Sequence, residues 1–230
     1  MNNERIIKLI VLGDSGVGKT SIIERIKSGK FQKMPSGGDI ITIQRKYESK
    51  NIMIKLNFLD GWGSEPYVNL YLGYIHNSNI ILLVFSDINT LNILRDRWNH
   101  FYKEKANLEN SIIILIGNKS DIFEDKRDEI LNKGQEFADE IDTHFLTCSA
   151  KTGDNMDNLE RIIISEAKRF IDKEEKEKEK KYYSIKKKAK KDKRENLKND
   201  NYEHKKIVNY DDENKVSIWQ NSKLNKYISF

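Results

Sequence analysis

A glycine-rich segment near the N-terminus has the residue types and spacing of a phosphate-binding loop. Residues 13–20, Gly-Asp-Ser-Gly-Val-Gly-Lys-Thr, follow an apolar run and precede a segment of helical period. Glycines let backbone N–H groups turn toward an anion, and the helix N-terminus adds partial positive charge. In such loops the lysine reaches the β- and γ-phosphates and the hydroxyl binds Mg²⁺. The alternative, a glycine-rich turn without a ligand, fits this context poorly. The expected phosphate contacts are Asp14, Ser15, Gly16, Val17, Gly18, Lys19, Thr20 and Ser21, with Thr20 also a metal ligand.

A second polar segment directly follows the apolar run 112–116 and contains Asn118, Lys119 and Asp121. An aspartate can accept both the N1–H and the 2-amino hydrogens of guanine, a pattern that adenine cannot return. We expect Asp121 to bind the guanine edge and the Lys119 stem to cover a ring face. For Asn118 two roles stay open, contact with the base edge and bracing of the phosphate loop. A polar loop with no ligand is the alternative interpretation of this segment.

A third segment, Ser149-Ala150-Lys151, follows the last apolar run of this part of the chain. Its backbone N–H groups could donate to guanine O6. Three common residues carry little information alone, so this prediction depends on their order behind the other two motifs.

The first 170 residues alternate apolar, β-branched runs with segments of helical period. We expect strands near 5–12, 40–48, 52–59, 80–85, 112–116 and 145–148, with helices near 19–28, 91–105 and 126–142 and from Asn155. This alternation predicts a three-layer α/β domain with a mostly parallel sheet, to which a hairpin at residues 49–51 adds one antiparallel edge strand. Ligands of such folds bind at the carboxyl ends of the strands, and all three motifs lie there.

Together the three motifs resemble those of the Ras superfamily of small GTPases, and the Rab branch most closely. The resemblance covers roughly residues 4–171 and includes Gly117 to Asp121 and Cys148 to Asn155. It implies a P-loop GTPase domain with a six-stranded sheet and five helices. It also implies GTP and GDP as ligands, Mg²⁺ as cofactor, and two switch segments that bind effector and exchange-factor proteins.

The first switch departs from the family pattern. Small GTPases carry a threonine about nineteen residues after the phosphate-loop lysine, where it closes over Mg²⁺ and the γ-phosphate. In this chain the corresponding position is Gly38. Thr42 would serve only if the loop were remodelled, and Ser36 is a weaker candidate.

The second switch departs as well. The family sequence Asp-Thr-Ala-Gly-Gln-Glu appears here as Asp-Gly-Trp-Gly-Ser-Glu at residues 60–65. Asp60 can still hold Mg²⁺ through water, and Gly63 can still offer its N–H to the γ-phosphate. Ser64 stands where the family has the glutamine that orients the attacking water, and its side chain is too short for that task. No residue of this chain is therefore assigned to catalysis.

Three functions are compatible with the chemistry of these residues. The first is a Rab-like molecular switch with weak intrinsic GTP hydrolysis, in intracellular trafficking or signalling. The second is a non-cycling adaptor that keeps GTP or GDP as a structural ligand, favoured by the changes at Gly38 and Ser64. The third, an ATPase or kinase, is disfavoured by Asn118, Lys119 and Asp121.

Charge divides the chain into two parts. It has 41 basic and 36 acidic residues, of which 18 and 11 lie in residues 173–230, leaving 23 and 25 in residues 1–172. The apolar periodicity also stops near Asp172. We therefore expect a GTPase domain at residues 1–172 and a Lys-rich, low-complexity tail at 173–230 that is partly helical or disordered.

The tail contains a dense basic block, Lys186 to Arg194. It could bind an anionic membrane, nucleic acid or a nuclear import receptor, or be no more than a solvated run. Cys148 is the only cysteine, so we expect neither a disulfide nor a C-terminal prenyl group. The N-terminal residues do not resemble a signal peptide. We expect a cytoplasmic monomer that is peripheral to a membrane, or nuclear, only through the tail.

Overall fold

The structure is a computed structural model that describes residues 4–33, 40–60, 73–106 and 110–214. Contacts within the chain divide it into two units, Met1–Lys173 and Glu174–Phe230, and each unit is described by itself.

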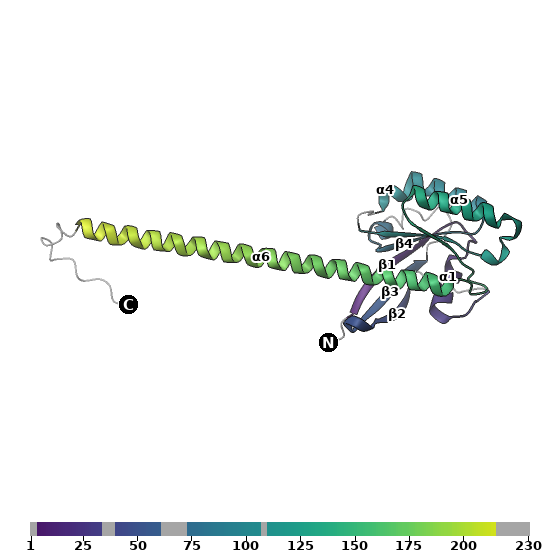
Figure 1. The fold of residues 1–230 in the computed structure, drawn as a ribbon, viewed down its shortest axis with the longest axis horizontal. Coiled ribbons are helices and arrows are strands. Elements are labelled where there is room, and N and C mark those ends of the chain that lie inside the picture. The colour runs from purple at the N-terminus through teal and green to yellow at the C-terminus, as the bar shows by residue number, and fades with distance from the viewer. Residues whose placement is uncertain (1–3, 34–39, 61–72, 107–109, 215–230) are drawn as a thin grey trace. The chain divides into compact units, whose positions relative to one another are not determined.

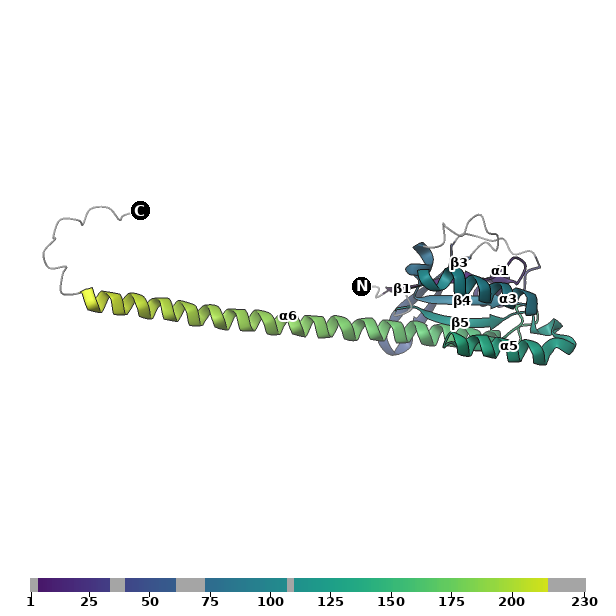
Figure 2. The same ribbon diagram turned by 90° about the horizontal axis from the view of Figure 1, so that it is seen from above.

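The first unit is built on a six-stranded sheet with the order β2-β3-β1-β4-β5-β6 (Figure 1). Only β2 runs antiparallel to its neighbour, β3, and the other adjacent pairs are parallel. Figure 2 shows β1, β4 and β5 side by side. This sheet confirms the mostly parallel arrangement that the sequence predicts. The strands are β1 (Glu4–Leu12), β2 (Ile40–Tyr47), β3 (Ile52–Asp60), β4 (Ile80–Phe85), β5 (Ile112–Gly117) and β6 (His144–Thr147).

The described residues contain five labelled α-helices, as expected for the fold class. They are α1 (Lys19–Ser28), α3 (Ile88–Arg97), α4 (Lys103–Lys105), α5 (Arg127–Glu140) and α6 (Met156–Asn214). Between α3 and α4 the chain forms a π-helical segment, Trp98–Tyr102, where the sequence predicts one continuous helix.

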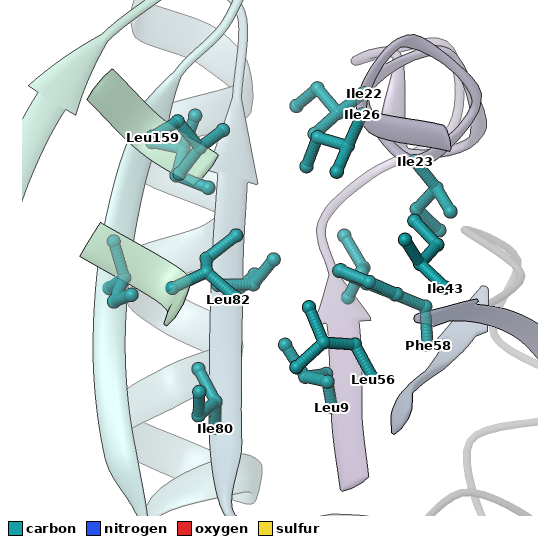
Figure 3. Packing of buried hydrophobic residues seen from close by; sticks show 14 of the residues in the cluster. Leu9, Ile22, Ile23, Ile26, Ile43, Leu56, Phe58, Ile80, Leu82 and Leu159 are labelled. Atoms are coloured by element: carbon teal, nitrogen blue, oxygen red, sulfur yellow. The ribbon is translucent and has the colours of Figure 1, made fainter. Parts of the chain in front are cut away.

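The sheet is buried on both faces because successive side chains of a strand point to opposite sides. On one face, Leu9 and Val11 of β1 pack with residues of α1 and of the first turns of α6. Figure 3 shows part of this cluster, with Ile23 of α1 next to Ile43 and Phe58. On the other face, Ile10 packs in a cluster that includes residues of α3 and α5. Helices therefore cover both faces of the sheet and leave the carboxyl ends of the strands to the connecting loops.

The second unit begins within α6, which stays helical to Asn214. Residues 176–188 are exposed, and Tyr182, Tyr183 and Ile185 are the large apolar side chains among them. Within the described residues no helix combines the length and the apolar character needed to cross a bilayer.

Candidate functional site

The glycine-rich segment connects the end of β1 to Lys19, the first residue of α1. A Cβ atom on Gly13 would lie 2.1 Å from the backbone oxygen of Val84, and one on Gly18 would lie 2.3 Å from Asn118 Nδ2. No larger residue fits at either position without a shift of its neighbours. Ser15 and Gly16 are exposed at the outer part of the loop, whereas Val17 is buried.

The Lys19 side chain folds back over the loop that precedes it. Its Nζ donates hydrogen bonds to the backbone oxygens of Gly13, at 3.1 Å, and Asp14, at 2.8 Å. Only 7% of the residue is exposed, and this burial lowers the pKa of the ammonium against the opposing charges of Asp60 and Asp14. A cation held among backbone amides at the start of a helix is a suitable partner for an anion.

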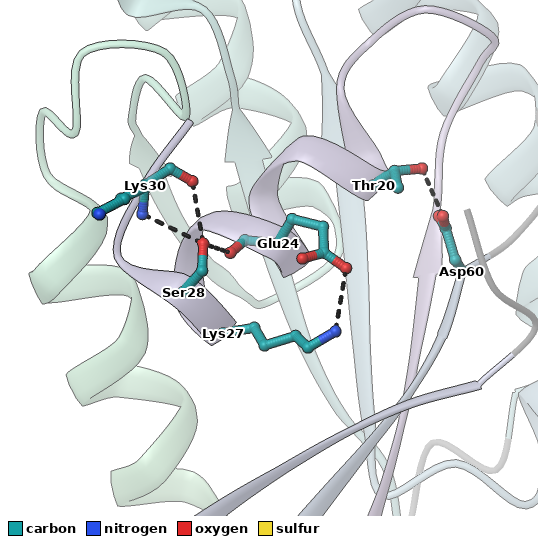
Figure 4. A network of polar contacts seen from close by, with 6 residues as sticks. All are labelled: Thr20, Glu24, Lys27, Ser28, Lys30 and Asp60. Carbon is teal, nitrogen blue, oxygen red and sulfur yellow. Dashed lines mark hydrogen bonds and ion pairs between the residues drawn. The ribbon is translucent and has the colours of Figure 1, made fainter. Parts of the chain in front are cut away.

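Thr20 and Asp60 meet where α1 begins and β3 ends. The Thr20 hydroxyl donates a hydrogen bond to Asp60 Oδ2 (Figure 4). Asp60 is 8% exposed, and burial raises the pKa of its carboxyl against the Thr20 hydrogen bond and the Lys19 charge. Within the described residues, Asp60 Oδ1 is buried and has no hydrogen-bond partner.

The Thr20 hydroxyl and the Asp60 carboxylate fit a magnesium ion. Mg²⁺ prefers hard oxygen ligands and is commonly held by one or two protein oxygens together with phosphates and water. The unpaired Asp60 Oδ1 is the acceptor that such a metal-bound water would satisfy. No group of three or more His, Cys, Asp or Glu side chains is arranged as a metal site elsewhere in the described part of the chain.

Asn118 joins the first and third motifs. Its Nδ2 donates to the backbone oxygen of Val17 at 2.8 Å, and its Oδ1 accepts the N–H of Ala150 at 3.1 Å. The residue is 1% exposed. Of the two roles that the sequence leaves open for Asn118, the geometry favours bracing of the phosphate loop.

Asp121 lies beside the third motif. Its Oδ1 accepts a hydrogen bond from Ser149 Oγ at 2.6 Å, and Lys151 Nζ is 3.7 Å from its Oδ2. Lys119 has a left-handed backbone, with φ of 64°, and its side chain is half-buried. The second and third motifs therefore form one surface, although 28 residues separate Asp121 from Ser149.

The backbone donors of the third motif are partly in use. Ala150 N–H donates to Asn118 Oδ1, and Ser149 N–H donates to the backbone oxygen of Asp154 at 2.9 Å. A ligand oxygen at this loop would share Ala150 N–H with Asn118 or bind Lys151 N–H.

Two residues outside the motifs support these loops. Asp154 Oδ2 accepts a hydrogen bond from Ser120 Oγ at 3.2 Å, which fastens the second motif to the turn after the third. Arg97 Nη1 lies 3.3 Å from Asp14 Oδ1 in the phosphate loop. The sequence predicts no role for either residue, although Asp154 lies within the stretch Cys148 to Asn155 that carries the resemblance. Asp154 lies beside the third motif, but no sequence pattern connects Arg97 to a loop 83 residues earlier.

Several predicted positions lie outside the described residues. They are Ser36 and Gly38 in the first switch and Gly63 and Ser64 in the second. Thr42, the alternative metal ligand, is described. It lies in β2, where its Oγ1 donates to Asn57 Oδ1 at 2.9 Å.

The third motif, Ser149 to Lys151, is called the base loop below. Cys148 directly precedes it and is buried, with Sγ 3.9 Å from Asn118 Oδ1. Burial raises the pKa of its thiol to about 12. The thiol is therefore protonated at neutral pH and serves as a packing residue rather than as a nucleophile.

Comparisons with known proteins agree with this arrangement. A model of the Ras family matches residues 8–169. The Ras-related protein RABE1e of Arabidopsis thaliana is 32% identical over 170 residues, 71% of this chain and 74% of the relative. RAB1BV of Beta vulgaris is 35% identical over 170 residues, 71% and 75% of the two chains. RABE1d of Arabidopsis thaliana is 32% identical over 173 residues, 72% and 77% of the two chains. The matched region includes all three motifs.

Proposed function

Because the chain belongs to the Ras family of small GTPases, we propose that it is a Rab-like switch that binds GTP and GDP with Mg²⁺. The nucleotide would bind at the site formed by the three motifs. The observation that carries this proposal is the bridge made by Asn118, which bonds both Val17 and Ala150. One buried side chain thereby fixes the phosphate loop relative to the base loop, as a nucleotide with its base at one end and its phosphates at the other requires.

The phosphate end of the ligand would lie over residues 14–21. Lys19 Nζ, now bonded to two backbone oxygens, would turn to the β- and γ-phosphates. Thr20 and Asp60 would hold Mg²⁺, the latter through water. A magnesium ion there supplies positive charge that neutralises the phosphate oxygens. Gly63 would offer its N–H to the γ-phosphate.

The base end would lie between Asp121 and the third motif. The Asp121 carboxylate, oriented by Ser149 Oγ, would accept the N1–H and 2-amino hydrogens of guanine. Lys119 would cover one face of the ring. Ala150 N–H and Lys151 N–H would donate to O6, with Ala150 shared with Asn118.

The rate of GTP hydrolysis distinguishes two versions of this proposal, a slowly hydrolysing switch and a non-cycling adaptor. Ser64 cannot orient water as a glutamine does, and Gly38 has no hydroxyl for Mg²⁺ or the γ-phosphate. Thr42 would have to leave β2 and Asn57 to replace that hydroxyl. This observation favours slow hydrolysis and supports a second candidate function, an adaptor that retains its nucleotide without cycling.

Partners follow from the family. Ras-family proteins bind effector and exchange-factor proteins, and we propose that this chain does so through residues of its two switch segments in a trafficking or signalling pathway. We also propose that the basic block Lys186–Arg194 contacts an anionic partner. The exposure of Lys186, Lys187 and Lys188 supports this proposal. Binding of the full-length protein to vesicles with and without anionic lipid, compared with binding to RNA, would test it.

The nucleotide recovered from the purified protein tests the central proposal. The full-length protein is denatured and its released nucleotides are separated by chromatography. We expect about one GDP or GTP per chain and no ATP. A chain that folds but carries no nucleotide, and binds neither GDP nor GTP when they are added with Mg²⁺, would refute the proposal.

A further inference from the structure

An arginine from α3 reaches the side chain of a phosphate-loop residue. Arg97 Nη1 lies 3.3 Å from Asp14 Oδ1, and the two side chains are 23% and 25% exposed. An ion pair shielded to this degree is screened less by salt than a surface pair. Of the predicted phosphate-loop residues, Asp14 is the one with an acidic side chain.

The π-helical segment explains how Arg97 is held in place. Lys103 N–H bonds the backbone oxygen of Trp98, five residues earlier, whereas an α-helix bonds residues four apart. In an α-helix, side chains five residues apart are rotated by about 140° relative to each other. The wider π turn reduces this rotation and brings Tyr102 nearer the side of Arg97, to which it is hydrogen-bonded.

Tyr102 is the second partner of the Arg97 side chain. The residue is 6% exposed and packs in the core between the sheet and α3. Burial raises the pKa of its hydroxyl, so the group is neutral at physiological pH. The Arg97 side chain therefore has two partners, the buried phenol of Tyr102 and the carboxylate of Asp14. A side chain with two partners loses less conformational freedom when a ligand binds than an unpaired one would.

Asp14 also forms a hydrogen bond with Lys19. Its backbone oxygen accepts the 2.8 Å hydrogen bond from Lys19 Nζ. When Lys19 turns to a phosphate group, Asp14 loses this contact and keeps the one to Arg97. The Arg97 guanidinium, 3.3 Å from the carboxylate, offsets the negative charge of Asp14. Without Arg97, an unbalanced carboxylate would remain in a loop that receives a polyanion.

We propose that Arg97 is a positioning residue for nucleotide binding, which holds the phosphate loop through Asp14, offsets the carboxylate charge and slows nucleotide release. The proposal rests on the guanine-nucleotide binding proposed above. Arg97 needs no contact with the ligand in this role. The π turn from Trp98 to Tyr102 is then a functional feature, because it supplies the second support of the arginine.

The test is the release rate of a fluorescent GDP, N-methylanthraniloyl-GDP, from the full-length protein. The variants are Arg97→Gln, Asp14→Asn, their combination, and Arg97→Lys, which keeps a cation. Arg95→Gln is the matched control, because Arg95 lies on the same helix and pairs with Glu140 on α5, away from the phosphate loop. Thermal unfolding is measured for each variant.

We expect Arg97→Gln to accelerate release about tenfold, which corresponds to about 1.4 kcal/mol. Arg97→Lys should restore most of the natural rate. The double variant should release GDP more slowly than Arg97→Gln alone, because it leaves no unbalanced carboxylate. Arg95→Gln should release GDP at the natural rate.

Three results would overturn the proposal. They are a natural release rate in Arg97→Gln, equal acceleration by Arg95→Gln, and effects of Arg97 and Asp14 that simply add. If Arg97→Gln does not fold, Arg97→Lys takes its place. The proposal is then overturned if Arg97→Lys releases GDP as fast as Asp14→Asn. A natural protein that takes up no fluorescent GDP would refute the proposed function itself, a result distinct from all of these.

Discussion

The side-chain amide of Asn118 donates a 2.8 Å hydrogen bond to the backbone oxygen of Val17, 101 residues earlier in the chain. The same side chain accepts the N–H of Ala150. Both partners are buried, so neither can exchange this contact for bulk water. The bridge therefore stabilises the domain and also sets the spacing between two loops of the proposed ligand site.

Asn118→Ala tests both effects. The substitution leaves the Val17 oxygen and the Ala150 N–H without this partner, at a cost of about 1–3 kcal/mol for each unsatisfied buried group. We expect lower thermal stability and weaker GDP binding, measured by calorimetry. Asn99→Ala is the control, because Asn99 lies on the exposed side of its helix and bonds Glu140. Equal stability of the two variants would contradict the role given to Asn118.

Lys19→Ala and Thr20→Asn test the phosphate and metal contacts. Each removes one contact to a charged group of the ligand, so we expect about ten- to hundredfold weaker binding of GTP in the presence of Mg²⁺. Lys27→Ala is the matched control on the same helix, because the Lys27 side chain is half exposed. Circular dichroism should show an intact fold in all three variants. Unchanged GTP affinity in both site variants would place the ligand elsewhere.

The proposed boundary at residue 172 is tested by truncation. Among the residues of α6 whose burial is described, the last buried one is Ile171, which packs against the sheet with Ala167 and Ile163. A chain of residues 1–172 should therefore fold and bind GDP with the affinity of the full-length protein, measured by fluorescence titration. An insoluble or nucleotide-free fragment, beside a loaded full-length protein, would show that the tail is needed.

Much of the fold and of the ligand site could be predicted because the information is local. The segment from Gly13 to Thr20 carries its own turn and helix start, and the strand alternation predicts which ends of the sheet it shares with Asn118. Alternation along β1 also explains why Ile10 and Val11 enter different cores.

Other features could not be predicted, because they depend on distant contacts. The hydrogen bond between Arg97 and Asp14 joins α3 to a loop that lies 83 residues earlier in the sequence. The π turn at Trp98–Tyr102 replaces a helix that the 3.6-residue period predicts as continuous, and it places Tyr102 in the core. Asp154 supports Ser120 and Ser149 although the motifs do not include it.

Ser64→Gln separates the two versions of the proposed function. Intrinsic hydrolysis by the natural protein should be at or below the order of 10⁻⁴ per second that is typical of small GTPases. A faster rate in Ser64→Gln, measured by phosphate release in single turnover, would show that the missing glutamine was limiting. An unchanged rate would favour the adaptor. Rapid unassisted hydrolysis by the natural protein would contradict both versions, because it requires another residue to orient the water.

The base specificity of Asp121→Asn tests the account most directly. Xanthine carries a 2-oxo group where guanine has its amino group, and an asparagine amide can donate to that oxygen. A matched pair of hydrogen bonds to a base discriminates by about 1–3 kcal/mol, or about five- to 150-fold in affinity. The measurement is the affinity for GDP and for xanthosine diphosphate, with Asp125→Asn as a control in the next turn. The natural protein and the control should prefer GDP, and Asp121→Asn should prefer xanthosine diphosphate. An unchanged preference for GDP in Asp121→Asn would contradict the assignment of Asp121 as the guanine-binding residue.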